Sequence, residues 1–179
     1  MFSTIKYPLE YTATPDDEKY LGSTCFFPNI SQYFASTDAM RGFAAWCIAR
    51  WVVNKSGGTL AKGLRVLHHN NATYVPGVAV AGAAGADVEF AGFVNPFMTA
   101  TTVADGYGFW LITEGFTKVG YDGSAAFAIR DNLSGAASGW CSEATENYTD
   151  PWIIGKALEA KTSGSAGDLI SAFVKMPFA

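Results

Sequence analysis

From residue 64 onward, short apolar segments recur along the chain and are separated by turns that contain glycine. Segments of this kind are typical of the strands of an all-β domain. The spacing contains no fixed-period repeat. We expect strands at residues 64–68, 75–80, 88–94, 107–113, 116–120, 125–129, 153–160 and 169–176.

The last of these segments shows a clear two-residue alternation, which places successive side chains on opposite faces of a strand. Both faces would hold apolar groups. We therefore expect one face to pack on the core and a partner to cover part of the other. The two faces are Ile170, Ala172, Val174 and Met176 against Leu169, Ser171, Phe173 and Lys175.

Two turn signals predict hairpins. Glu114-Gly115 separates two apolar segments, and glycine accepts the positive φ that tight hairpin turns require. The run 54–58, Asn-Lys-Ser-Gly-Gly, separates a strand-like segment at 47–53 from the segment at 64–68. We expect a hairpin at each of these turns.

Residues 36–54 fit two interpretations. Ser36, Thr37 and Asp38 are suitable helix caps, and apolar residues follow at helical spacing. The second half also alternates as a strand, and Gly42 weakens a helix. We favour a short helix or turn before residue 44, followed by a strand.

Residues 1–35 differ from the rest of the chain. Pro8, Pro15 and Pro28 prevent a long regular element, yet aromatic side chains are too frequent for a polar disordered tail. One interpretation is an extended arm that docks its aromatic side chains on a neighbouring surface; the other is a strand with loops on the chain's own core. The candidate interface residues of the arm are Tyr7, Tyr11, Tyr20, Phe26, Phe27, Tyr33 and Phe34.

Composition narrows the possible functions. Only 16% of the residues are charged and the formal net charge is −4, so we expect no direct contact with nucleic acid. No apolar run is long enough to span a membrane, and we expect no membrane partner. Cys25, Cys47 and Cys141 are odd in number and widely spaced, which fits free thiols in a reducing cytoplasm.

Motifs for catalysis are weak. His68 and His69 are the only histidines, and neighbours on a strand point to opposite faces. The chain contains no Gly-x-Ser-x-Gly motif, and its carboxylates are scattered over expected turns. We therefore expect no catalytic residue, no metal site and no cofactor, and the chain is not expected to be an enzyme.

Four stretches of the C-terminal two-thirds combine small and apolar residues in a consistent order. Residues 51–66 give a strand, a turn, Leu-x-x-Gly and a strand, and residues 102–115 give an aromatic strand followed by a glycine turn. Residues 129–140 give a polar turn and a Gly-aromatic pair, and residues 154–177 give a closing hairpin. Together they resemble the small capsid decoration, or cement, proteins of tailed bacteriophages.

The resemblance implies a β-sandwich or barrel-like fold, no catalysis, and attachment to a capsid lattice. We accordingly expect a mainly β chain: an extended N-terminal arm at 1–35, at most one short helix, and a β-rich capsid-binding domain of antiparallel hairpins at 36–179. The first 40 residues have no counterpart in the resemblance.

The resulting hypothesis is a virion structural protein that binds the outer capsid surface and cements neighbouring capsomers. Its partners would be the major capsid protein and copies of itself, as a homotrimer or, alternatively, a dimer. It would be assembled in the host cytoplasm and reside on the capsid exterior. Two alternatives remain. One is a carbohydrate-binding or host-attachment β domain displayed on the virion, which would expose tryptophans in a line. The other is a small hydrolase, which would gather titratable groups in a pocket.

Overall fold

The structure is a computed structural model that describes residues 8–10, 12–13, 21–36, 38, 40, 44–68, 78–81, 90–123, 126–136, 139–144, 153–162 and 164–175. Over these ranges the fold is mainly β, as expected, and its one helical element is the short 3₁₀ helix Ile30–Tyr33. The strands are β1 Thr12–Ala13, β2 Thr24–Phe27, β3 Cys47–Asn54, β4 Leu60–Ala61, β5 Arg65–His68, β6 Val78–Ala81, β7 Phe90–Val94, β8 Thr102–Val103, β9 Gly108–Gly120, β10 Asn132–Gly135, β11 Cys141–Glu143, β12 Gly155–Ala157 and β13 Leu169–Lys175.

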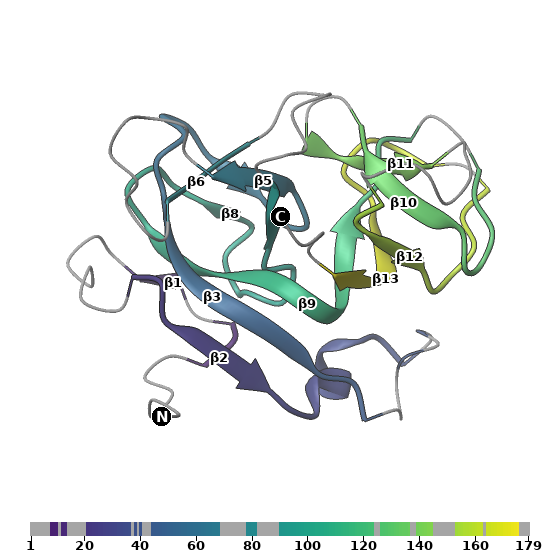
Figure 1. Cartoon of the computed structure of the whole chain (residues 1–179), viewed down its shortest axis with the longest axis horizontal. Coiled ribbons are helices and arrows are strands. Elements are labelled where there is room, and N and C mark those ends of the chain that lie inside the picture. Colours follow the sequence, from purple (N-terminus) through teal and green to yellow (C-terminus); the bar gives the residue numbers. More distant parts are fainter. Residues whose placement is uncertain are drawn as a thin grey trace.

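Five strands close into a ring in the order β9-β7-β5-β6-β3 and back to β9. All pairings in the ring are antiparallel except the one between β3 and β6, which is parallel. Strand β2 pairs with the outer edge of β3, while the short β4 and β8 pair with each other. This part of the molecule is therefore barrel-like (Figure 1).

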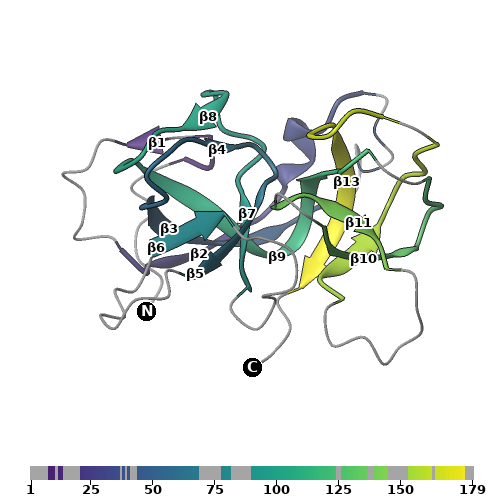
Figure 2. The ribbon, with the colours of Figure 1, turned by 90° about the horizontal axis from the view of Figure 1, so that it is seen from above.

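Strand β9 is 13 residues long and continues beyond this ring. Its second half pairs with β13, and the sheet goes on through β12 and β10 to β11. A bridge between Tyr121, just after β9, and Cys141 of β11 brings the last strand back to the end of β9. Figures 1 and 2 show the resulting two lobes, with β9 running from one into the other.

Alternation along the strands divides the apolar side chains between two clusters. In β3, Trp51 belongs to the larger cluster and the next residue, Val52, to the smaller one. The smaller cluster joins Val52 to Phe109 and Leu111 of β9. Each buried leucine, valine or phenylalanine side chain contributes about 1.5–3 kcal/mol, so the two clusters are the main stabilising term of the fold.

The closing hairpin is confirmed. Strand β12 pairs antiparallel with β13, and Ile170, Ala172 and Val174 are buried in the larger cluster. On the opposite face Phe173 is only partly buried and Lys175 is exposed. Apolar groups thus occur on both faces of β13.

The hairpin turn predicted at Glu114-Gly115 is wrong, because β9 runs through these residues without turning. Gly115 does adopt a positive φ of 102°, but within β9, where it pairs with Cys47 close to a register shift between Ile48 and Ala49. Glycine serves a bulge and a turn equally well. The residue type alone could not distinguish them.

The hairpin predicted between residues 47–53 and 64–68 is also wrong. Strands β3 and β5 are separated in the ring by β6. The buried side chain of Asn54 donates to the carbonyl oxygens of Gly58 (2.8 Å) and Val103 (3.0 Å). These bonds hold the turn against the segment that contains β8, so the chain leaves β3 toward the β4–β8 pair.

The described part of residues 1–35 packs on the chain's own core. Strand β2 pairs with β3, and Phe27, Ile30 and Phe34 are buried in the larger cluster. Leu9 is buried as well, and its carbonyl accepts a hydrogen bond from the Asn95 amide. These residues follow the second of the two interpretations, and an extended arm at residues 1–35 stays a prediction.

Candidate functional site

Four aromatic side chains gather on the outer face of the sheet where β2, β3, β9 and β13 meet. Phe116 of β9 and Phe173 of β13 are register partners and so lie on the same face. Trp46 directly precedes β3, two positions before Ile48, which is the register partner of Phe26 in β2. We call Phe26, Trp46, Phe116 and Phe173 the aromatic surface.

The four rings form one cluster, in which the Trp46 ring contacts the other three. The Trp46 ring lies 5.8 Å from Phe26, 6.4 Å from Phe116 and 6.0 Å from Phe173, measured between centroids. Phe116 and Phe173 are 5.1 Å apart in an edge-to-face arrangement. Phe26 is 46% exposed and the other three are partly buried. The surface is therefore preassembled, and a partner could bury it with little loss of side-chain entropy.

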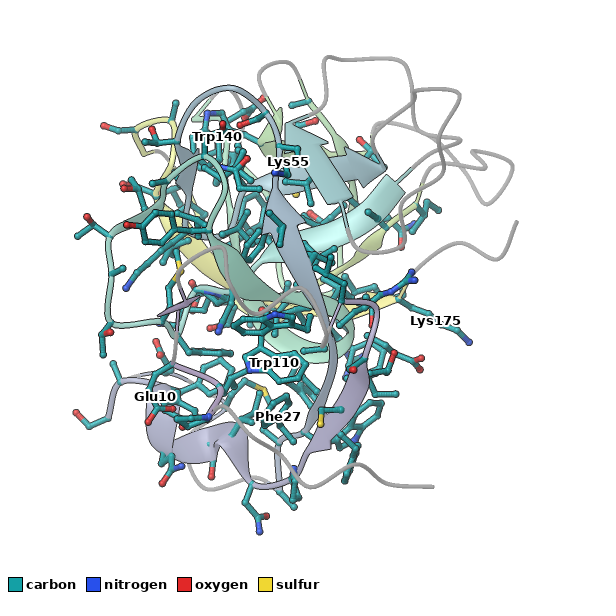
Figure 3. The ribbon with its side chains drawn as sticks, turned by 90° about the vertical axis from the view of Figure 1, so that its left-hand side faces the viewer. Glu10, Phe27, Lys55, Trp110, Trp140 and Lys175 are labelled. Atoms are coloured by element: carbon teal, nitrogen blue, oxygen red, sulfur yellow. The ribbon has the colours of Figure 1, made fainter. Side chains whose placement is uncertain are left out.

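Charged residues border the aromatic surface on two sides. Two register positions beyond the Phe116–Phe173 pair, Glu114 faces Lys175, whose side chain projects away from the ribbon (Figure 3). Two positions in the other direction is Lys118, which forms a salt bridge with Asp38 at 2.7 Å. An apolar centre with a charged border is the usual anatomy of a binding surface.

Gly115 allows this surface to form. The amide of Phe116 donates to the carbonyl of Trp46 at 2.8 Å, so the two strands approach closely at this point. A Cβ atom at residue 115 would lie only 2.8 Å from the Cα of Cys47, within the backbone of β3. Only glycine therefore fits here without displacing Trp46 from Phe116.

The seven interface residues expected from the sequence fall into four groups, of which Tyr33 alone is the last. Phe26 belongs to the aromatic surface. Phe27 packs edge-on against Trp110 at 5.2 Å, as Figure 3 shows, and Phe34 packs against Phe97 at 5.4 Å, so both are core residues with little surface to offer a partner. Tyr7, Tyr11 and Tyr20 lie outside the described residues.

Tyr33, the seventh residue, is held by its own chain. Its ring stacks on Phe97 at 5.4 Å, and its hydroxyl donates to the Glu10 carboxylate at 2.6 Å. Burial and this hydrogen bond raise the pKa of Tyr33 to about 12. Tyr33 therefore ties residues 8–10 to the segment that follows β2.

Sequence reasoning missed Trp46, Phe116 and Phe173 as a group because they are far apart along the chain. The available signal was the presence of apolar residues on both faces of the last strand, which includes Phe173. Nothing in the sequence pairs that strand with β9 rather than with another strand.

The described thiols and acids form no reactive cluster. Cys25, Cys47 and Cys141 are buried, and burial raises the pKa of Cys25 and raises that of Cys47 to about 12. A thiol with a raised pKa is a poor nucleophile. Among the described residues, no three His, Cys, Asp or Glu side chains are grouped so as to hold a metal ion. The same residues include no helix long and apolar enough to cross a membrane.

The tryptophans bear on the carbohydrate-binding alternative. Trp51 and Trp110 are buried and pack edge-to-face at 5.2 Å. Trp46 and Trp140 are partly buried, and Trp152 lies outside the described residues. The exposed line of tryptophans that a sugar platform would use is therefore not formed by the four that the structure describes.

The comparison with known proteins finds likeness to solved structures. No family model matches the chain, and no curated protein matches it. Among solved structures, the chain is similar to the head fiber gp8.5 N base of bacteriophage phi29, with 14% sequence identity and a TM-score of 0.46. The match covers 73% of this chain and 96% of that chain.

Proposed function

We propose that the chain is a virion structural protein that binds the outer capsid surface and cements neighbouring capsomers. The observation that carries the proposal is the aromatic surface: a preassembled set of rings, partly open to solvent and bordered by charges. Aromatic anchors with a polar rim are the pattern found at the centres of protein–protein interfaces. The resemblance of residues 51–177 to phage cement proteins supplies the class of partner, the major capsid protein.

The protein would cement capsomers by bridging them. A protein that contacts two capsomers adds its own contacts to those that must break before the capsomers separate. A closed oligomer, which we propose to be a trimer at a three-fold site, would hold several capsid subunits at once. Each contact can be weak, since the second and third form at the high effective concentration set by the first.

The direct test is particle occupancy. Phe26→Ser removes the most exposed ring of the surface, and its 46% exposure means that the fold should tolerate the change. Particles assembled without the protein are mixed with wild type or variant, sedimented, and assayed for bound protein and for heat resistance. We expect reduced occupancy and a smaller gain in heat resistance for the variant.

Tyr107→Ser is the matched control, because Tyr107 is 38% exposed and directly precedes β9, outside the aromatic surface. Both variants are first checked for an unchanged melting temperature. Equal occupancy of wild type and Phe26→Ser would contradict the role of this surface. Wild-type protein that binds no particles would contradict the proposed function itself.

The N-terminal arm is tested separately. The tyrosines that could act from it, Tyr7, Tyr11 and Tyr20, are replaced together by serine, which leaves Leu9 and Glu10 in place. We expect lower occupancy on the same particles. Unchanged occupancy would exclude a role for these three side chains.

A further inference from the structure

Strand β2 lies at one end of the large sheet and has β3 as its partner among the described strands. The Trp51 amide of β3 donates to the Ser23 carbonyl at 2.8 Å, and Cys25, two residues on, holds the equivalent position in the pairing. In an antiparallel pair, the residues between such positions direct their backbone groups away from the partner strand. Thr24 and Phe26 therefore point their amide and carbonyl groups toward the outer edge of β2.

This outer edge is open in the described part of the chain. Thr24 and Phe26 are both exposed, and no backbone hydrogen bond from another described segment reaches either residue. An open edge is a template on which an extended polypeptide can form a further strand. The edge borders the aromatic surface, because Phe26 belongs to both. A strand added here would lay its side chains beside that surface.

Arg50 brings a charge to this edge. It is the register partner of Thr24, in a pair that exchanges no backbone hydrogen bonds, so the two side chains lie close together on one face. The Nε atom of Arg50 is buried and has no hydrogen-bond partner, and no salt bridge among the described residues includes Arg50. Buried donors are nearly always paired in folded proteins. Arg50 thus has an unused donor beside the open edge.

We propose that an extended segment of the capsid protein pairs with the outer edge of β2 and presents an acidic side chain to Arg50. The segment would form main-chain hydrogen bonds with Thr24 and Phe26, and its apolar side chains would lie beside Phe26 and Trp46. Its carboxylate would accept hydrogen bonds from the Arg50 guanidinium across the short side chain of Thr24. This inference rests on the proposed function, because it names the form and the charge of the partner that the aromatic surface binds.

The other cations on this face already have an opposite charge nearby. Lys118 is paired with Asp38 by a salt bridge at 2.7 Å. Lys175 stands opposite Glu114 in the register. Arg50 is then the cation of this face for which the described residues hold no opposite charge, and a partner with a carboxylate would complement it.

The need for a carboxylate argues against a second copy on this edge. Two copies paired edge to edge would place β2 beside β2, and residues 21–27, Leu-Gly-Ser-Thr-Cys-Phe-Phe, contain no acidic side chain. Such a pair would leave both copies of Arg50 without a carboxylate and would bring two like charges together. The observations therefore favour an acidic segment of a different protein.

Proline substitution tests the edge. Thr24→Pro removes an outward amide but no bond to β3, and an edge strand accepts proline when the missing N–H faces solvent. Its melting temperature should stay near that of wild type. Its affinity for particles assembled without the protein, measured as occupancy over a concentration series, should fall ~10-fold or more, because a main-chain bond is lost. Thr24→Ala keeps the amide and should bind like wild type.

Cys25→Pro is the matched control for the fold. Cys25 directs its amide toward β3, so this proline removes a bond within the sheet and should lower the melting temperature clearly. The two proline variants are neighbours on one strand and differ in the direction of the lost amide. Together they separate a use of the outer edge from general damage to β2.

Arg50→Met tests the charge. Methionine keeps most of the length of the side chain and removes the buried unpaired donor, so the melting temperature should equal or exceed that of wild type. Affinity for the particles should fall, and added salt should weaken the remaining binding less than it weakens wild type. An Arg50 with a purely structural role would give the opposite pattern: a lower melting temperature and unchanged affinity of the folded protein.

Four results would overturn the inference. Thr24→Pro with wild-type affinity would exclude strand addition. Arg50→Met with wild-type affinity and salt dependence would exclude the acidic contact. A wild-type oligomer that Thr24→Pro dissociates, seen by light scattering, would assign the edge to a second copy. A melting temperature of Thr24→Pro as low as that of Cys25→Pro would assign the edge to the chain's own residues.

The proposed function fails in a different way. If wild type binds particles and both Thr24→Pro and Arg50→Met bind equally well, the inference is wrong and the proposed function stands. If wild type binds no particles, the proposed function is wrong, and the inference falls with it. Weaker binding by both variants at unchanged melting temperature would support the two together.

Discussion

Gly115→Ala is expected to destabilise the fold through two separate effects. Gly115 has a φ of 102°, and a side chain in such a conformation costs roughly 1–3 kcal/mol. Its new Cβ would also lie 2.8 Å from the Cα of Cys47, a backbone atom that cannot rotate away. Overpacking of this kind costs roughly 1–3 kcal/mol more. The expected total, roughly 2–6 kcal/mol, is a large fraction of the ~5–15 kcal/mol that stabilises a typical domain.

Two other glycines separate these effects. Gly57 has a φ of 75° but nothing within 4 Å of its Cβ position, so Gly57→Ala should show only the conformational cost, roughly 1–3 kcal/mol. Gly58 has open space and no positive φ, so Gly58→Ala should stay within about 0.5 kcal/mol of wild type. The expected order of destabilisation is Gly115→Ala, then Gly57→Ala, then Gly58→Ala.

The assay is urea denaturation followed by tryptophan fluorescence, with the free energy of unfolding taken from the midpoint and slope. The Gly115 variant should also lose the contact between Trp46 and Phe116, and therefore occupancy in the particle assay. If Gly115→Ala and Gly57→Ala lower the free energy of unfolding by amounts that agree within about 0.5 kcal/mol, the close approach of β3 and β9 adds no steric cost at residue 115.

Three further predictions concern stability. Asn54→Ala removes the bonds to Gly58 and Val103 and should cost about 3 kcal/mol, seen as a melting temperature lower by ~6–12 °C; an unchanged melting temperature would contradict it. Arg130 has a φ of 78°, a conformation that favours glycine, so Arg130→Gly should stabilise the protein by up to ~1 kcal/mol in urea denaturation; a loss would show that the backbone there is unstrained. Burial raises the pKa of Cys47 to about 12 from 9.0, so the unfolded chain releases this proton at a lower pH than the folded chain does. The free energy of unfolding should therefore fall as pH rises from 9 to 12, and it should fall less steeply in Cys47→Ala. A rise over that window would refute the reasoning.

The local part of the fold could be predicted from the sequence. The alternation in residues 169–175 reports a strand directly, because the side-chain period is a property of the segment itself. The closing hairpin followed since β12 and β13 are near in sequence. At Gly115 the same reasoning failed: a positive φ satisfies a turn as well as a bulge, and only the distant partner β3 decides between them.

The aromatic surface shows the same limit. Phe26 could be named from the sequence as an interface residue, but so were Phe27 and Phe34, which the structure buries. Phe26 and Phe27 are neighbours of the same chemical type on opposite faces of β2. Which of them faces solvent depends on the register with β3, and a shift by one residue would exchange them.

The sharing of β9 between the two lobes has a consequence for how the protein is made. Residues 114–120 of β9 take their partner on one edge from β13, which leaves the ribosome much later than β9 does. Until then the nascent chain presents an open strand edge that bears Phe116, the kind of edge on which polypeptides stick to one another. Slow translation or a missing C-terminal strand should therefore appear first as insoluble protein rather than as a stable single lobe.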